Sequence, residues 1–313
     1  MQQQQYPLPK ILFKRFHNAF TKVLSQYICL HKRILRLHLV FYSSNLNRSP
    51  PKKGYIEQLW IRTYYALNQA LSQGFLIEHP SDPHWVYLPG TDISTLTTAY
   101  QQNSFTYNLW THQDRSYQMG MHANSVIRGI LAFKNFPQPK TPPTFQLKSS
   151  QQVSEVTPDA FFLAPTPTAF EVKDGLSDIW PDPTKITRRS DKQQQLLDHF
   201  EMCKQNHLRP GLIAVKVDPL FYDFANTYNG LVFELGFQIF PPYSPFDIYK
   251  NTISTDLGFK NIVLASEDPP YPHEFNRFLN WLNKLKQSAT PWQDIRTSLD
   301  VDNSGVLIIA SIV

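Results

Sequence analysis

Charged side chains interrupt two short apolar segments near the middle of this chain. Residues 159–163 and 169–173 are rich in Phe, Val and Leu, and a Pro- and Thr-containing stretch joins them. Two apolar runs joined by such a turn predict a β-hairpin. The hairpin nevertheless carries Asp159, Glu171 and Lys173 where alternation predicts buried strand. An acid buried in a strand costs several kcal/mol unless it is paired or binds a metal, so these charges require a reason.

The expected pairing brings the three charges together. If the strands pair symmetrically about Thr166, Asp159 faces Lys173 and Phe161 faces Glu171. Glu171 and Lys173 are two positions apart and therefore project from one face of their strand. The residues between and beside them, Phe170 and Val172, anchor the opposite face in a core. We therefore expect one cluster of two carboxylates and an ammonium group.

Such a cluster suits hydrolysis assisted by a divalent cation. Facing and diagonal neighbours in an antiparallel pair lie roughly 5 to 8 Å apart, which lets two carboxylates share one ion. Mg²⁺ takes oxygen ligands and keeps several waters, and Mn²⁺ can substitute for it. A bound cation can activate water and neutralise charge on a phosphate under attack. Lys173 is then placed to hold the attacking water or a phosphate oxygen.

The pattern Pro158-Asp159 followed by Glu171-Val172-Lys173 resembles the PD-(D/E)XK nuclease superfamily. The resemblance implies an α/β (α+β) fold: a restriction-endonuclease-like mixed β-sheet flanked by helices. It also implies metal-dependent cleavage of phosphodiester bonds. By similarity, Asp159 and Glu171 would be metal ligands and Lys173 the catalytic lysine.

The superfamily usually adds a Glu from an early helix, and that residue is not evident here. The segment 114–133 before the motif contains no Glu, only Asp114 and Asn124. The candidates for an additional acid are Glu57 and Glu155. Without such an acid the site works with two carboxylates, or the chain is an inactive descendant.

The segment after the hairpin continues the resemblance. Residues 184–205 predict a helix with an apolar stripe, and 211–217 predict a central strand. Strand, strand, helix, strand is the order of the superfamily core, and the resemblance covers about residues 120–220. Basic residues in the first half of the helix either contact DNA phosphates or form a solvated face: Lys185, Arg188, Arg189 and Lys192. Family members often place a Gln in this helix; Gln194 is our candidate, and Gln193 and Gln195 are also available.

Charge is distributed unevenly along the chain. Residues 1–56 contain ten Lys or Arg and no acid, whereas the remainder holds 20 basic and 25 acidic residues. A basic arm on a mildly acidic body indicates an anionic partner, with DNA as the first candidate. The apolar spacing within 10–42 predicts a core-forming or dimer-forming helix, so a homodimer is one interpretation. An organelle transit peptide is the alternative reading of this acid-free N-terminus.

Turn signals divide the chain into three expected regions. We expect a basic helical arm at 1–50, a candidate winged-helix-like DNA-contacting region at 51–115, and the nuclease core with a C-terminal extension at 116–313. The middle region rests on a helix at 55–73 followed by a hairpin, and a plain helix–hairpin appendage is an equal reading. Other expectations are a loop or exposed strand pair at 94–113, aromatic loops at 218–230 and 241–250, a helix at 274–286 and a buried strand at 305–313.

Several other classes of protein are disfavoured. The two cysteines, Cys29 and Cys203, cannot build a disulfide scaffold or a CxxC zinc site, and they suit a reducing compartment. The ten His show no metal-ligand spacing, so each reads as a core or surface residue. No GxSxG, Walker-type or GxGxxG motif is present. Charges interrupt every apolar stretch, so no membrane span is expected.

The sequence therefore predicts a Mg²⁺-dependent DNA endonuclease, of the restriction or defence type, in the cytoplasm and associated with the nucleoid. Two alternatives remain. One is the endonuclease subunit of a transposon, in which TPD is likewise followed by EVK and a helix. The other is a catalytically inactive DNA-binding or assembly protein with a nuclease-like fold.

Overall fold

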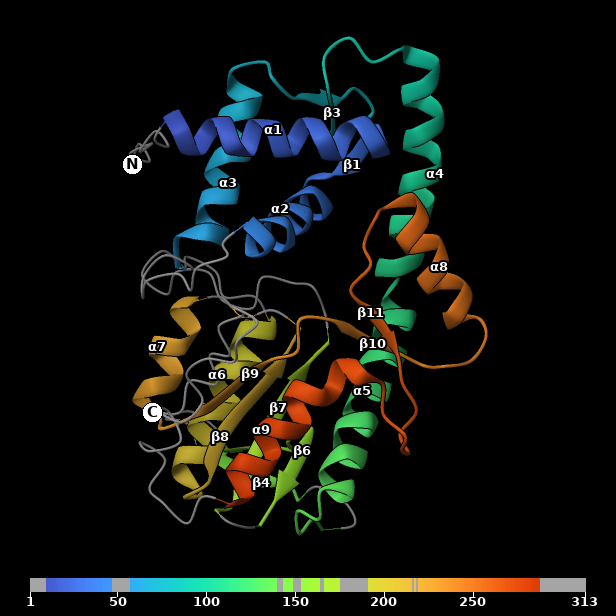
Figure 1. Ribbon diagram of the computed structural model, residues 1–313. Helices are drawn as coiled ribbons and strands as arrows, with labels where there is room; N and C mark the ends of the chain where they lie inside the picture. The colour runs from blue at the N-terminus through green and yellow to red at the C-terminus, as the bar shows by residue number, and fades with distance from the viewer. Residues whose placement is uncertain are drawn as a thin grey trace. The chain divides into compact units, whose positions relative to one another are not determined.

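The chain is a mixed α/β protein that folds into two compact units (Figure 1). The computed structural model describes residues 10–46, 57–139, 143–148, 153–163, 166–174, 191–215, 217 and 219–287. The first unit comprises the chain up to His112 together with Ile248–Lys260. The second comprises Gln113–Asp247 and the chain from Asn261 onward.

The first unit combines helices with a small antiparallel sheet. Its sheet has the order β1-β3-β2, with Leu30 opposite Val86. Its elements are α1 (Lys10–Tyr27), β1 (Cys29–His31), α2 (Lys32–Leu46), α3 (Glu57–Ser72), β2 (Ile77–His79), β3 (Asp82–Tyr87), α4 (Ile93–Thr111) and most of α8 (Phe246–Asp256). The expected helix at 55–73 and the hairpin after it are confirmed by α3, β2 and β3.

The helix expected over most of 10–42 is confirmed as α1 and α2, although the chain breaks between them at Ile28. The backbone there takes a positive φ of 61°, and Cys29 then enters β1. The amide of Asn103 donates to the carbonyl oxygens of Tyr27, at 3.1 Å, and Cys29, at 2.7 Å. Pairing of β1 with β3 and this side-chain bridge from α4 replace helical hydrogen bonds that the local sequence could otherwise make.

The expectation of a loop or exposed strand pair at 94–113 is wrong, because the helix α4 occupies that segment. Asp92 caps the helix, and its Oδ2 accepts the backbone N–H of Thr95 at 2.9 Å. Although the segment is polar, Leu96 and Trp110 are buried on its inner face. The helix is therefore stabilised by its N-cap and by a few buried apolar residues. Its apolar periodicity in the sequence is weaker than that of α9 (Asn276–Gln287).

The second unit is built on a four-stranded sheet of order β6-β7-β8-β9. β6 pairs antiparallel with β7, while β7 with β8 and β8 with β9 pair in parallel. Two smaller sheets pair β4 with β5 and β10 with β11. The elements are α5 (Gln113–Phe133), β4 (Phe145–Lys148), β5 (Val153–Val156), β6 (Ala160–Phe162), β7 (Thr168–Lys173), α6 (Asp191–Gln205), β8 (Arg209–Ala214), α7 (Pro219–Thr227), β9 (Leu231–Glu234), β10 (Gln238–Phe240), β11 (Ile262–Leu264), the 3₁₀ turn η2 (His273–Phe275) and α9.

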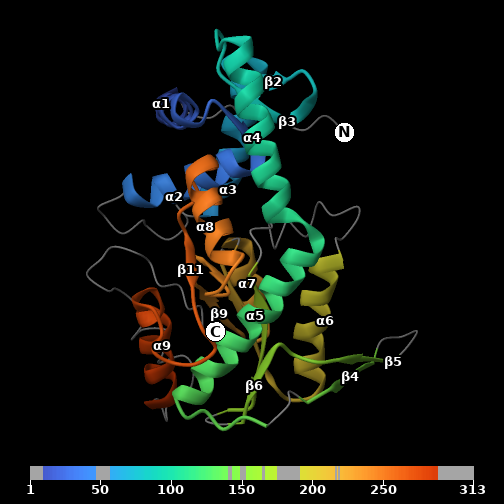
Figure 2. The same ribbon diagram turned by 90° about the vertical axis from the view of Figure 1, so that its right-hand side faces the viewer.

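Helices cover both faces of this sheet, which gives three layers (Figure 2). On one face, Phe170 and Val172 of β7 pack with apolar residues of α5 and with Trp281 of α9. On the other face, Ala169 of β7 packs with α6, whose Phe200 also contacts residues of α7. Alternate residues of β7 therefore enter different cores, as a strand buried on both faces requires.

Other sequence expectations have mixed outcomes. The helix at 274–286 and the order strand, strand, helix, strand are confirmed by α9 and by β6, β7, α6 and β8. The expected aromatic loops at 218–230 and 241–250 are wrong, because α7 and the start of α8 form there. Their aromatic side chains, such as Phe221, supply the buried face that stabilises each helix. The expected strand at 305–313 lies outside the described residues. Within the described ranges, no helix is long and apolar enough to cross a membrane.

Candidate active site

The β6–β7 hairpin brings the predicted charges together, but in a different register. Phe161 lies opposite Ala169, not opposite Glu171, so the expected pairing about Thr166 is wrong by two residues. A shift of two keeps every side chain on its original face of the sheet. The apolar pattern therefore could not distinguish the two registers. Continued one residue beyond β6, the observed register places Asp159 opposite Glu171. The two carboxylates are then facing neighbours, whereas the expected register made them diagonal neighbours.

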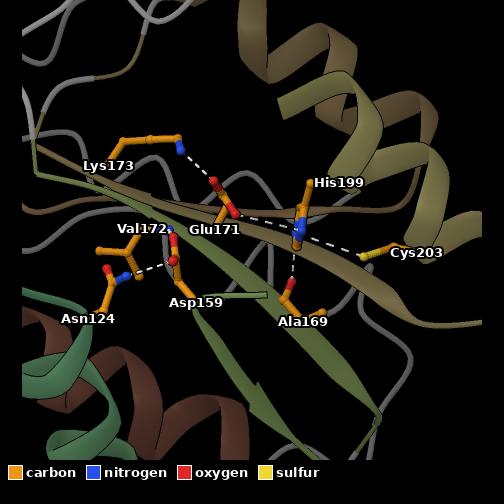
Figure 3. Close-up of polar contacts among 8 residues, drawn as sticks. All are labelled: Asn124, Asp159, Ala169, Glu171, Val172, Lys173, His199 and Cys203. Atoms are coloured by element: carbon orange, nitrogen blue, oxygen red, sulfur yellow. Dashed lines mark hydrogen bonds and ion pairs between the residues drawn. The ribbon is translucent and has the colours of Figure 1, made fainter. Parts of the chain in front are cut away.

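Asp159 lies at the entrance of β6 and is held at both of its oxygens (Figure 3). The side-chain amide of Asn124, on α5, donates to Oδ1 at 2.6 Å. The backbone N–H of Val172, on β7, donates to Oδ2 at 2.8 Å. Burial, and then the negative charge of Glu171, raise the pKa of Asp159 to about 6. The carboxylate is thus fixed in orientation but costly to ionise where it lies.

Glu171 and Lys173 form an ion pair on the same face of β7. The Lys173 ammonium donates to Oε1 of Glu171. The Glu171 side chain is only 13% exposed and that of Lys173 21%. Both groups are therefore largely desolvated yet reachable from solvent, as a site that admits a small ion or a phosphate group must be.

His199, on α6, approaches the other oxygen of Glu171 (Figure 3). Its Nε2 lies 3.1 Å from the carbonyl oxygen of Ala169, which can only accept, so Nε2 carries the hydrogen. Nδ1 lies 4.0 Å from Oε2 of Glu171, and this buried nitrogen has no hydrogen-bond partner. Burial lowers the pKa of His199 to about 4. The neutral imidazole therefore directs the lone pair of Nδ1 toward the Glu171 carboxylate. These two groups repel each other, and a cation bound between them would remove the repulsion.

Asn124 and His199 are the site residues that sequence reasoning missed. Each interrupts a buried, apolar helix face. Asn124 follows the buried Ala123 and precedes Val126 on α5, and His199 lies between Leu196 and Phe200 on α6. A single polar residue within an apolar stripe was the available signal, because a buried polar group needs a partner.

The remaining predicted residues do not join the cluster. Glu155 is exposed on β5, opposite Gln146, and among the described residues no three His, Cys, Asp or Glu side chains gather closely enough to hold a metal. Gln194 is exposed on α6, and its amide donates to Asp198 at 2.7 Å along the helix surface. Glu155 is thus not the third acid.

Other predicted residues cannot be placed at the site. Glu57 is the first residue of α3 in the first unit, and its side chain lies outside the described part. Lys192 lies in α6, with its side chain likewise outside the described part. Lys185, Arg188 and Arg189 lie outside the described residues.

The donor set that remains fits a small, hard cation. Asp159 and Glu171 supply carboxylate oxygens from adjacent strands, and each Asp159 oxygen has accepted one hydrogen bond and keeps further lone pairs. Mg²⁺ is commonly bound by one or two carboxylates, with waters and substrate phosphates completing its shell. Burial, and then the negative charge of Glu171, raise the pKa of Asp159, and a divalent cation bound at this carboxylate would favour its ionised form.

Comparison with models of protein families gives no match to this chain, and neither the curated proteins nor the solved structures compared with it give one. The function therefore has to be inferred from the geometry of the site.

Proposed function

We propose that this protein is a Mg²⁺-dependent DNA endonuclease with a restriction-endonuclease-like core in its second unit. The observation that carries the proposal is the desolvated pair of carboxylates, Asp159 and Glu171, on adjacent strands beside Lys173. Such an arrangement costs folding free energy and is difficult to justify as structure alone. Its residue types are those that phosphodiester hydrolysis with a bound cation uses.

The surrounding topology supports the same proposal. An antiparallel hairpin, a helix and a parallel strand follow each other as β6, β7, α6 and β8. α5 precedes the hairpin and directs Asn124 at Asp159, which is where the superfamily usually supplies its early-helix acid. This order of elements is the one that the resemblance of the motif implies, and it supports the proposal.

Each residue has a distinct part in the proposed chemistry. Asp159 and Glu171 would hold Mg²⁺, and Mn²⁺ would serve in its place. When bound, the cation would lower the pKa of a water and offset charge on the phosphate under attack. Lys173, already paired with Glu171, is placed to hold that water or a phosphate oxygen.

The first unit supports a role in holding DNA. Its elements follow the order helix, strand, helix, helix, strand, strand, and β3 lies between β1 and β2. This is the order of a winged-helix module, in which the third helix usually enters the major groove. Tyr64 and Asn68 are exposed on that helix, α3. The described parts of α1 and α2 contain no acid, which favours a polyanionic partner.

The test is cleavage of supercoiled plasmid DNA by the full chain with Mg²⁺, beside Lys173→Ala. We expect nicking or linearisation by the wild type, none with EDTA, and none by the variant. Lys148→Ala is the matched control, because Lys148 is an exposed lysine of the same unit in β4. Equal cleavage by wild type and Lys173→Ala would refute the proposal.

One observation favours a second candidate, a non-catalytic DNA-binding or assembly protein with the same fold. α5 presents the neutral Asn124 to Asp159, where the superfamily usually has a Glu. If wild type and Lys173→Ala bind DNA equally and neither cuts with Mg²⁺ or Mn²⁺, this second candidate holds. Within the nuclease proposal, a restriction enzyme would cut alone, whereas a transposon endonuclease subunit would cut at transposon ends with a partner transposase.

A further inference from the structure

Asn124 is a polar residue at the edge of a buried, apolar helix face in the second unit. It lies on α5, the helix that directly precedes the β4–β5 and β6–β7 segments, and its neighbours Ala123, Val126 and Ile127 are completely buried. A polar side chain at the edge of such an apolar face loses its contact with water. Its retention there needs a specific hydrogen bond or a ligand.

The hydrogen bond it makes is with Asp159. The amide nitrogen donates to Oδ1 at 2.6 Å, while the backbone N–H of Val172 donates to Oδ2. These two donors come from different elements, α5 and β7, and together they fix the plane of the carboxylate. The carbonyl oxygen of the Asn124 amide is buried and has no partner. The acceptor oxygen of this amide is therefore unused in the protein alone.

The neutrality of Asn124 also sets the charge of the site. Asp159 and Glu171 carry two negative charges when ionised, and Lys173 offsets one of them. A third acid at position 124 would add a further negative charge to this pair. No third acid joins the pair among the described residues.

We infer that Asn124 is the positioning residue of this site: its amide orients the Asp159 carboxylate for a divalent cation. The inference rests on the proposed function, because it assumes that the carboxylate pair holds a cation. It concerns a residue that the three-residue motif does not contain.

The test is calorimetric titration of Mn²⁺ into the full-length protein at neutral pH, without DNA. We expect one Mn²⁺ per wild-type chain. Asn124→Ala should weaken binding about tenfold, the lower end of the effect seen when an outer-shell partner is removed. Asn124→Asp, which keeps the shape of the side chain but replaces the N–H that donates to Asp159 by an acceptor, should likewise weaken binding.

Gln118→Asp is the matched control, since it adds the same charge at an exposed position of the same helix. It should leave the affinity for Mn²⁺ within about twofold of wild type, because the added charge is exposed to solvent and screened by salt. Urea unfolding of each variant in EDTA shows whether the fold is kept. Asn124→Asp, being isosteric, covers the case in which Asn124→Ala does not fold.

The outcomes separate this inference from the proposed function. If Lys173→Ala abolishes cleavage but both Asn124 variants bind Mn²⁺ like wild type, the positioning role is refuted and the nuclease proposal stands. If the wild type binds no Mn²⁺ at millimolar concentration, the cation site and the proposed function both fail.

Discussion

The two units of this protein differ in where the charged side chains discussed above lie: on the surface in the first unit and within the sheet in the second. In the first unit, basic residues such as Lys14 and Arg15 are exposed on α1, and the small sheet is lined by stacked rings, with His79 lying 3.9 Å from Tyr100 between centroids. In the second unit, carboxylates enter the sheet itself, where burial raises the pKa of Asp159. Exposed charges act at long range at little cost, whereas buried ones are costly and need a local purpose. Under the proposed function, the first unit would attract DNA and the second would carry out hydrolysis.

The largest effect should come from removing one charge of the carboxylate pair. Glu171→Gln should reduce the rate of plasmid cleavage on the order of 10³-fold, as loss of a major electrostatic contributor does in other enzymes. DNA affinity should change little. Glu78→Gln in the first unit is the control, because Glu78 is an exposed acid that pairs with Lys32. A large loss of cleavage in Glu78→Gln as well would break the division between the units.

Two glycines test whether each unit can be disturbed separately. A Cβ at Gly211, in β8, would lie 2.2 Å from Cδ1 of the buried Phe170. Gly211→Ala should therefore lower the free energy of unfolding by about 1–3 kcal/mol, the usual cost of overpacking, and reduce cleavage.

Gly258→Ala is the counterpart in the first unit. Its Cβ would lie 2.2 Å from Cζ of Tyr27, and its φ of +68° disfavours any side chain. It should lower stability and DNA affinity but leave Mn²⁺ binding intact. Urea unfolding, DNA binding and Mn²⁺ titration of both variants provide the comparison. Equal loss of Mn²⁺ binding in both would contradict it.

The buried acid of the second unit should make stability depend on pH. The pKa of Asp159 is raised from 3.8 to about 6, so the folded state binds its proton more tightly than the unfolded state does. In the absence of cation, this group's contribution to stability is present below pH 3.8 and is lost as the pH rises through about 6. Asp159→Asn should therefore gain stability relative to wild type across that window, by up to about 3 kcal/mol.

Urea unfolding in EDTA at pH 5 and pH 7 measures this difference. Mn²⁺ should reverse the loss in wild type at pH 7 and have little effect on Asp159→Asn. A difference between the two proteins that does not grow with pH would show that Asp159 is not strained by its surroundings. It would also weaken the contrast between the units.

The smallest effect is expected at the basic surface of the first unit. Replacing Lys14 and Arg15 by Gln should weaken DNA binding and reduce the slope of log affinity against log salt by about 0.9 for each phosphate that is no longer neutralised. Cleavage at saturating DNA should be unchanged. Because α1 packs Phe16 and Phe20 into the unit, substitution is a cleaner test than deleting the N-terminal residues. An unchanged salt slope would assign this surface to another role, such as oligomerisation or targeting.

Elements with strong local signals could be predicted. The helices α3 and α9 have regular apolar stripes, and their bounds follow from that periodicity. The β6–β7 hairpin and its three charged residues could also be recognised, because charges in short apolar strands are unusual whatever the fold. α4 could not, since its cap at Asp92 precedes a polar segment with few apolar positions.

The sequence by itself determined which ionisable groups lie near one another along the chain: Asp159, Glu171 and Lys173 are close enough in sequence that one hairpin must bring them together. Tertiary structure decided their register, because a shift of two residues leaves the apolar pattern unchanged. It also decided which distant residues meet them. Asn124 and His199 come from helices 35 and 30 residues away from their partners Asp159 and Ala169. Only packing of α5 and α6 on opposite faces of the sheet places them at the site.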